Sequence, residues 1–118
     1  MNAMKIMIVD DSEPVRRMIA SFLDDVVDEF LECDDGSHAL ATYAKHRPDM
    51  VLMDIKMKQV DGFEATTEIK KAFPSARVFI VSQWDTTELR ALAEQSGADG
   101  YVSKANLQPL REFIEPRS

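Results

Sequence analysis

The chain has 118 residues, of which 45% are hydrophobic, and its 14 basic and 21 acidic side chains give a formal net charge of −7. This composition is typical of a globular domain rather than a disordered chain, and the acidic balance argues against non-specific nucleic-acid binding, which requires an excess of Lys and Arg. A single cysteine excludes an intramolecular disulfide, the N-terminus lacks the pattern of a signal peptide, and no apolar run approaches the roughly 20 residues of a membrane span, so we expect one cytoplasmic domain over residues 1–118 with no membrane contact.

Five short apolar runs, spaced fairly evenly along the chain, predict β-strands. They cover residues 4–9, 29–33, 50–53, 78–81 and 100–102. The first, third and fourth runs are almost entirely apolar, which is typical of strands buried on both faces of a sheet. The second and fifth are shorter and more polar.

Helical periodicity fills the intervals between these runs. The first helix should bury one face formed by Val15, Met18, Ile19 and Phe22, with Ser12 as its N-cap. Further helices are predicted around residues 40–44, 63–69, 89–94 and 106–115.

Two local signals mark the ends of the fourth predicted helix. Asp85 followed by Glu88 resembles a capping box at its start, and Gly97 is a typical C-terminal stop. Strand–helix alternation repeated five times predicts an α/β fold, with helices on both faces of a parallel sheet and right-handed crossovers.

Polar residues follow four of the predicted strands. Asp10 and Asp11 follow the first, Asp54 the third, Ser82 the fourth and Lys104 the fifth. Each of these taken singly is explained by a turn or a helix cap. Together they should converge, because ligands of open α/β sheets bind at the carboxyl ends of the strands.

The convergence of carboxylates with a lysine favours phosphoryl chemistry. Carboxylate oxygens are hard ligands that suit Mg²⁺ or Mn²⁺. A metal ion opposite the ammonium of Lys104 would hold a phosphoryl group. Asp54, on the strand expected beside the first, is then the best-placed nucleophile for forming an acyl phosphate.

Five motifs, in this order and spacing, resemble the response-regulator receiver domain of two-component signalling. They are Val9-Asp10-Asp11-Ser12, Met53-Asp54-Ile55-Lys56-Met57, Asp61-Gly62, Val81-Ser82 and Gly100-Tyr101-Val102-Ser103-Lys104. The resemblance covers essentially the whole chain. It implies a flavodoxin-like (βα)5 fold, doubly wound, with strand order 2-1-3-4-5.

The resemblance also implies a metal site. Asp11, Asp54 and the backbone carbonyl of Lys56 would ligate Mg²⁺, and Asp10 would act directly or through a bound water molecule.

The same resemblance assigns the phosphoryl chemistry to four residues. Asp54 would accept the phosphoryl group from a histidine kinase or a phosphotransfer protein, and Lys104 would contact the phosphoryl oxygens. Ser82 would move to hydrogen-bond the phosphoryl group, and Tyr101 would swing into the space that Ser82 leaves.

The sequence departs from the family pattern in its loops. Lys58 and Ala105 stand where the family often has proline. We expect a trans Lys104–Ala105 peptide bond, because a cis bond before a non-proline residue costs about 2.5–4 kcal/mol. Gln83 and Trp84 follow the switch serine, and Lys56 lies two residues after Asp54. We expect these long or bulky side chains to screen the phosphoryl group from water and slow autodephosphorylation.

These features predict a phosphorylation-dependent signalling switch rather than a turnover enzyme. Its output would pass through the surface of the fourth helix, fifth strand and fifth helix, around Leu89, Tyr101 and Leu110, to a protein partner. One alternative is a receiver domain of a longer regulator with a DNA-binding or enzymatic output domain. The others are a Mg²⁺-dependent phosphohydrolase with an aspartyl-phosphate intermediate and a passive Mg²⁺-binding module. Dimerisation on activation is left open.

Overall fold

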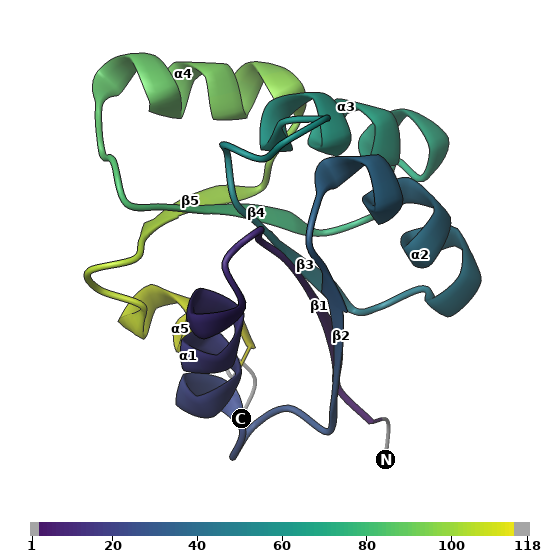
Figure 1. Cartoon of the computed structure of the whole chain (residues 1–118), viewed down its shortest axis with the longest axis vertical. Helices are drawn as coiled ribbons and strands as arrows, with labels where there is room; N and C mark the ends of the chain where they lie inside the picture. Colours follow the sequence, from purple (N-terminus) through teal and green to yellow (C-terminus); the bar gives the residue numbers. More distant parts are fainter. Residues whose placement is uncertain (1–2, 115–118) are drawn as a thin grey trace.

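A five-stranded parallel sheet forms the centre of the computed structural model, which describes residues 3–114 (Figure 1). The strands are β1 (Lys5–Val9), β2 (Glu29–Cys33), β3 (Met50–Met53), β4 (Val78–Ser82) and β5 (Gly100–Ser103). Their order is β2-β1-β3-β4-β5, and every neighbouring pair is parallel. The predicted fold class and strand order are therefore confirmed.

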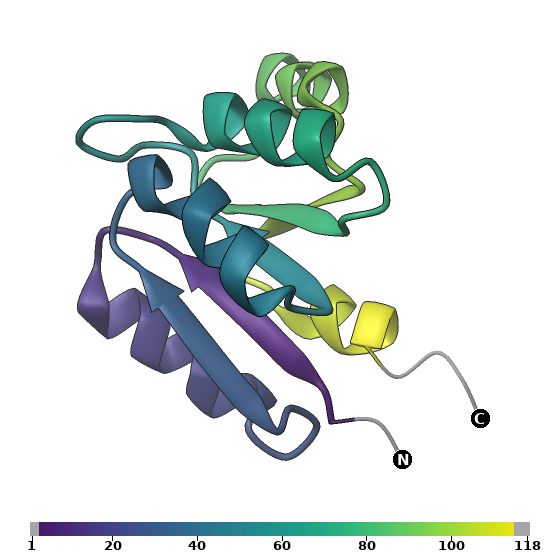
Figure 2. The ribbon, with the colours of Figure 1, turned by 90° about the vertical axis from the view of Figure 1, so that its right-hand side faces the viewer.

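Helices cover both faces of this sheet. They are α1 (Glu13–Leu23), α2 (Ala39–His46), α3 (Gly62–Ala72), α4 (Thr87–Ser96) and α5 (Gln108–Ile114), and a short 3₁₀ helix, η1, spans Gly36–His38. Helices α1 and α5 lie on one face, and α2, α3 and α4 lie on the other (Figures 1 and 2). No helix within residues 3–114 is long and apolar enough to cross a membrane.

Alternating residues of the central strands supply two separate cores. Ile6 and Ile8 of β1 pack with the buried residues of α1 and α5, whereas Met7 and Val9 pack with those of α2 and α3. A strand with helices on both faces must be apolar at every position, which explains the continuous hydrophobic runs in the sequence.

Helix α4 has a different N-cap from the one predicted. Thr86, not Asp85, is its N-cap, and the Thr86 hydroxyl accepts a hydrogen bond from the Leu89 backbone N–H at 3.1 Å. The predicted capping box is wrong because the carboxylate of Asp85 instead pairs with Arg90, at 2.6 Å. Gly97 ends the helix as expected, in the left-handed conformation with φ = 94°.

Helix α1 has the predicted cap and most of the predicted buried face, since Ile19 is buried and Val15 and Phe22 pack against the same core. Ser12 accepts a hydrogen bond from the Val15 N–H at 3.3 Å. Ile19 and Leu23, four residues apart, are fully buried, while Met18 is 43% exposed. Met18 was wrongly placed in the core, because it lies about 100° around the helix from Ile19.

Helix α5 begins later than predicted. It begins at Gln108, whose backbone N–H donates to the side chain of Asn106 at 3.2 Å. Asn106 therefore precedes the helix, as its capping chemistry favours. Residue 115, the predicted end, lies outside the described residues.

Candidate functional site

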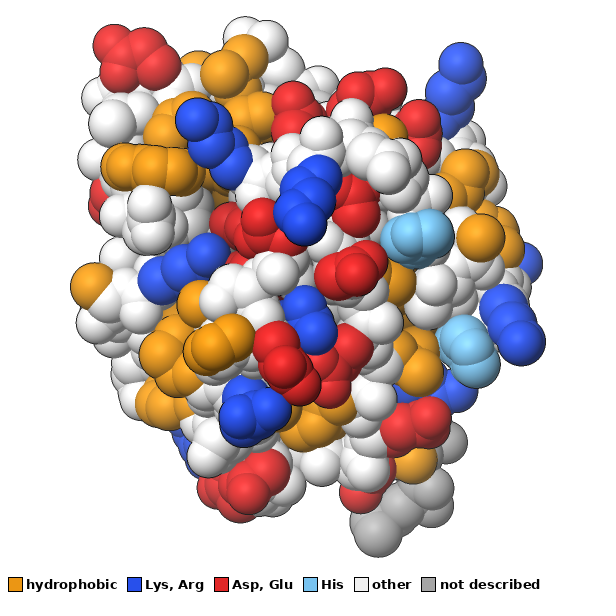
Figure 3. Space-filling view, in the orientation of Figure 1, with side chains coloured by type: hydrophobic (Ala, Val, Ile, Leu, Met, Phe, Trp, Pro, Cys, Tyr) orange, Lys and Arg blue, Asp and Glu red, His pale blue; other side chains and the backbone are white. Residues whose placement is uncertain are grey.

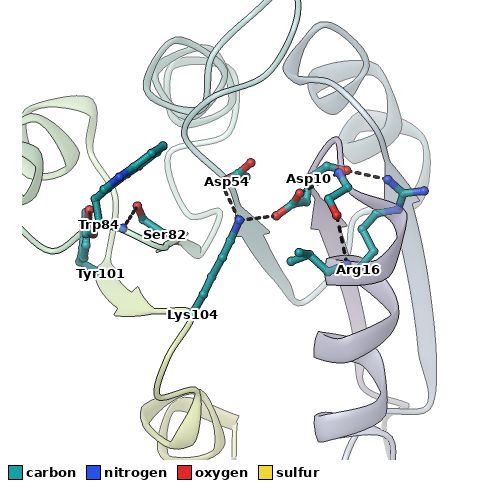
Figure 4. Close-up of polar contacts among 9 residues, drawn as sticks. Asp10, Arg16, Asp54, Ser82, Trp84, Tyr101 and Lys104 are labelled. Atoms are coloured by element: carbon teal, nitrogen blue, oxygen red, sulfur yellow. Dashed lines mark hydrogen bonds and ion pairs between the residues drawn. The ribbon is translucent and has the colours of Figure 1, made fainter.

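The carboxyl ends of the central strands bring together the acidic residues and the lysine (Figure 4). Asp10 follows β1 and Asp54 follows β3, and these strands pair so that Val9 lies beside Met53. The Asp54 backbone N–H donates to the Val9 carbonyl at 2.8 Å. Parallel pairing in this register therefore places the two aspartates next to each other.

Three carboxylates form a cluster at this edge. One oxygen from each of Asp10, Asp11 and Asp54 lies within 4.8 Å of the others. Asp10 and Asp54 are only 2% and 7% exposed, whereas Asp11 is open to solvent. Burial raises the pKa of Asp54, and the negative charge of Asp10 raises it further against the opposing charge of Lys104.

Lys104 reaches into this cluster from the loop after β5. Its Nζ lies 2.9 Å from Asp10 Oδ2 and 3.1 Å from Asp54 Oδ1. Burial disfavours the charged ammonium, but Asp10 and Asp54 outweigh this effect and raise the pKa of Lys104. The peptide bonds of the described residues include no cis bond, so the trans Lys104–Ala105 bond is confirmed.

Arg16 fixes the loop that carries the first two aspartates. Its Nη1 donates to the Asp10 carbonyl at 2.6 Å, and its Nε lies 2.6 Å from a Glu32 carboxylate oxygen. The Ser12 backbone N–H donates to Asp10 Oδ1 at 2.9 Å. Arg16 thus connects α1 to β2 and orients the backbone beside the cluster.

The donor set fits a hard divalent cation. Three carboxylates that converge on one point repel each other unless a cation or protons relieve the repulsion. Within residues 3–114 the Asp11 carboxylate has no hydrogen-bond or ion-pair partner. Oxygen ligands alone, with one side open to solvent, suit Mg²⁺ or Mn²⁺ and the water molecules they retain.

The two predicted switch residues meet through the backbone of Trp84. Ser82 is fully buried, and its hydroxyl accepts a hydrogen bond from the Trp84 N–H at 3.0 Å. The half-buried Tyr101 donates its hydroxyl hydrogen to the Trp84 carbonyl at 2.7 Å. The guanidinium of Arg90 lies 4.9 Å from the centre of the Tyr101 ring.

A cavity of about 300 Å³ opens over the cluster. Its lining residues are Asp10, Asp11, Ser12, Val15, Asp54, Lys56, Gln83, Trp84 and Lys104. The Nζ of Lys56 lies 5.9 Å from the centre of a Trp84 ring. Gln83, Trp84 and Lys56 therefore border the space above Asp54, as the screening hypothesis requires.

The face that contains this edge of the sheet combines charged and apolar surface. Acidic side chains with interspersed Lys and Arg lie at its centre, and hydrophobic side chains gather toward α4 (Figure 3). Of the three residues predicted on the output surface, Leu89 and Tyr101 are half-buried, but Leu110 is 0% exposed and packs inside the core. Leu110 was wrongly assigned to the output surface. Leu92, which the sequence did not single out, is 45% exposed on α4.

Sequence reasoning also missed Asp35. This carboxylate is 7% exposed and accepts hydrogen bonds from the backbone of the loop that follows Asp54. The available signal was an Asp34-Asp35-Gly36 turn after β2, at the same edge of the sheet as Asp10 and Asp54.

A sequence model of the response regulator receiver domain matches residues 6–115 of the chain. This match covers all five helices and, apart from Lys5, all five strands. The chain belongs to the response regulator receiver family. Receiver domains are signalling switches of two-component systems, and those systems act through phosphorylation.

Relatives of this receiver domain differ in length. It is 35% identical over 107 residues to the chemotaxis protein CheY of Halobacterium salinarum. The aligned region covers 91% of this chain and 89% of that protein. It is 39% identical over 106 residues to the response regulator protein VraR of Staphylococcus epidermidis, covering 86% of this chain and 50% of VraR. The receiver domain thus spans most of one relative and half of the other.

Solved structures support the same fold. Chemotaxis protein CheY4 of Vibrio cholerae matches with a TM-score of 0.87 and 25% identity over 98% of both chains. A LuxR-family two-component response regulator from Aurantimonas matches with a TM-score of 0.85 and 28% identity, over 98% of this chain and 88% of that one.

Proposed function

We propose that residues 1–118 form one cytoplasmic receiver domain that accepts a phosphoryl group on Asp54. The phosphoryl donor would be a histidine kinase or a phosphotransfer protein. The observation that carries the proposal is the position of the Lys104 Nζ, within 3.1 Å of both Asp10 and Asp54 at the rim of one cavity. A carboxylate nucleophile and a fixed cation therefore border the space that a phosphoryl group would enter.

Phosphoryl transfer requires that the Asp54 carboxylate is ionised and that one of its oxygens is free to attack. One Asp54 oxygen attacks the phosphorus of a phosphohistidine, an O–P bond forms and the N–P bond breaks. The electron pair of the N–P bond returns to the imidazole nitrogen. Lys104 neutralises negative charge on the transferred oxygens, the kind of electrostatic stabilisation on which phosphoryl transfer depends.

Asp10, Asp11, Asp54 and the Lys56 carbonyl are the proposed metal ligands. Bound Mg²⁺ would offset the charge of the carboxylates and of the incoming phosphoryl group. Asp11 offers the most accessible of these oxygens, and Asp10 and Asp54 supply the buried ones.

Phosphorylation would change the hydrogen bonding of Ser82. The phosphoryl group brings about −1.5 to −2 units of charge and three acceptor oxygens. A Ser82 hydroxyl that turned to donate to these oxygens would release the Trp84 N–H, which it now accepts from at 3.0 Å. The Trp84 carbonyl accepts the hydrogen bond of the Tyr101 hydroxyl. A movement of the Ser82 side chain would therefore displace β5 and α4 through the backbone of Trp84.

The output surface would be formed by α4, β5 and α5. Of the residues predicted there, it would include Leu89 and Tyr101, and it would also include the exposed Leu92. The partner would be a protein target or an output domain in the same polypeptide. Similarity to half of VraR supports the second arrangement, and similarity to most of a CheY supports the first.

Stoichiometric phosphorylation tests the assignment. With acetyl phosphate and Mg²⁺, intact-mass measurement should show one added phosphoryl group in the wild type and in Asp24→Asn, which removes an exposed carboxylate at the end of α1. Asp54→Asn should show none. Labelling of Asp54→Asn equal to the wild type would refute the assignment, and sustained phosphomonoester turnover would favour a phosphohydrolase.

Trp84 gives a second readout because it is the only tryptophan and lines the cavity. Its fluorescence should respond to Mg²⁺ and then to beryllofluoride, a phosphoryl mimic. An unchanged beryllofluoride response in Asp54→Ala would contradict the proposal.

A further inference from the structure

The carboxylate of Asp35 connects two loops that are far apart in the sequence. Its Oδ1 accepts a hydrogen bond from the Gln59 N–H at 2.8 Å, and its Oδ2 accepts from Ser37 at 2.8 Å and Val60 at 3.2 Å. Asp35 forms no ion pair with any of the residues described. It is thus a buried carboxylate whose partners are backbone N–H groups.

These hydrogen bonds keep Asp35 ionised. Burial alone would raise its pKa, but the backbone N–H groups of Gln59, Ser37 and Val60, together with the Ser37 side chain, outweigh burial and lower the pKa well below the usual range. Hydrogen bonds to an ionised acceptor are roughly twice as strong as those between neutral groups. Asp35 therefore ties the two loops together firmly at neutral pH.

The loop from Asp54 to Gly62 is packed closely at both of its ends. A Cβ atom on Gly62 would lie 1.8 Å from the Asp54 carbonyl oxygen, and the Gly62 N–H donates to the Ile55 carbonyl at 2.7 Å. At the other contact, a Cβ atom on Gly36 would lie 2.4 Å from the Val60 carbonyl oxygen. The backbone approaches at Gly36 and Gly62 leave no space for a side chain.

Between these anchors, little else holds the backbone of residues 56–58. Lys56 and Lys58 are exposed and Met57 is only partly buried. Nowhere in the described chain does a backbone–backbone hydrogen bond involve these three residues. Lys58 also lacks the ring that fixes φ in proline. The Asp35 hydrogen bonds to Gln59 and Val60 are the nearest polar anchors on the C-terminal side of Lys56.

We propose that Asp35 is a positioning residue for the metal site, acting through the loop that carries the Lys56 carbonyl. By holding Gln59 and Val60, it restricts the backbone of Lys56 and strengthens Mg²⁺ binding without contacting the ion. This inference rests on the proposed function, because it takes the cluster of Asp10, Asp11 and Asp54 as a Mg²⁺ site.

Asp35→Asn tests the inference with little change in size. An asparagine side chain presents an NH₂ group toward at least one backbone N–H, so a loop hydrogen bond is lost. Loss of a residue that orients a metal ligand typically weakens metal affinity about 10–100-fold, so the Mg²⁺ Kd should rise at least about tenfold.

The Mg²⁺ Kd should be measured by amide NMR shifts, with hydrogen exchange of Gln59 and Val60 as a second readout. Asp34→Asn makes the same charge change at the exposed neighbour, and Ile114→Val mildly destabilises the buried core at α5. Both controls should keep the wild-type Kd. Asp35→Asn should show the weaker Kd and faster exchange at Gln59 and Val60.

A wild-type Kd in folded Asp35→Asn would overturn the inference and leave the proposed function standing, since Asp35 would then serve stability alone. If Asp35→Asn does not fold, Gly36→Ala decides in the same way, because its added methyl group pushes against the Val60 carbonyl without removing a charge. Absence of Mg²⁺ binding in the wild type would overturn both this inference and the metal site of the proposed function.

Discussion

Replacing Lys104 with methionine removes the cation that lies between two buried carboxylates while keeping most of the side-chain volume. In the wild type the Lys104 Nζ is 2.9 Å from Asp10 and 3.1 Å from Asp54. After the change, Asp10 and Asp54 would face each other with oxygens no more than 4.8 Å apart. At an effective dielectric constant of about 20, two unit charges at that separation repel by about 3.5 kcal/mol.

We therefore expect metal-free Lys104→Met to be about 3 kcal/mol less stable than the wild type at neutral pH. The pKa of Asp54 is already raised in the wild type, and losing Lys104 raises it further. A carboxyl group whose pKa is raised in the folded state destabilises that state when it is ionised, and does so least when it is protonated. The deficit should therefore be small below the unfolded-state pKa of about 3.8 and should grow as the pH rises through the folded-state pKa.

Mg²⁺ should reverse most of the loss. The ion would supply the positive charge that Lys104 provided, and Lys104 would no longer compete with it for Asp10 and Asp54. Urea unfolding of both proteins, at acidic and neutral pH with and without saturating Mg²⁺, measures each effect. A deficit that is independent of pH and of Mg²⁺ would refute the reasoning, because it would show that lost packing rather than charge repulsion causes it.

Three further outcomes are expected from the same region. Gln83→Ala and Trp84→Ala should each speed loss of the phosphoryl group, because both side chains border the cavity; unchanged decay rates would reject the screening hypothesis. Gly62→Ala should destabilise the protein by about 3 kcal/mol in urea unfolding, because its methyl group overlaps the Asp54 carbonyl, and a wild-type midpoint would contradict that clash. Mg²⁺ affinity should fall as acidification passes through the raised pKa of Asp54, since a protonated carboxyl group is a poor ligand; a titration by NMR that shows constant affinity would exclude Asp54 as a ligand.

The strands could be predicted because local and tertiary requirements coincide in them. Residues 6–9 and 50–53 are apolar at every position, as a strand covered on both faces requires, and these residues are fully buried. Strand–helix alternation and crossover handedness predicted the parallel sheet, and the family resemblance supplied the strand order. The convergence of the acidic residues at the strand ends followed from that topology.

The exposure of individual helix residues could not be predicted in the same way. Met18 and Leu110 are apolar residues with helical spacing, yet Met18 points to solvent and Leu110 is completely buried. Helical periodicity selects a stripe but leaves its rotation uncertain by about one residue. Which residue lies at its centre depends on how α1 and α5 pack on the sheet.

Specific side-chain contacts were likewise not predictable from the sequence. Thr86 and Asp85 are both good N-cap residues, and the position of Arg90 decides between them by engaging Asp85. Asp35 lies 24 residues before Gln59, and no local pattern relates the two. The hydrogen bond between Asp35 and Gln59 forms only when the sheet brings these two loops to one edge.

By itself, the sequence determined the α/β fold, the five strands and the convergence of Asp10, Asp54 and Lys104, because apolar periodicity and strand-end chemistry are local properties. The tertiary structure alone decided that Lys104 bridges both aspartates, that Trp84 joins Ser82 to Tyr101, and that Asp35 holds the loop beyond Asp54. The physical reason is that hydrogen bonds and ion pairs depend on distances of about 3 Å between side chains and backbone. Those distances are set by how the strands register and the loops pack, which no local pattern of residues specifies.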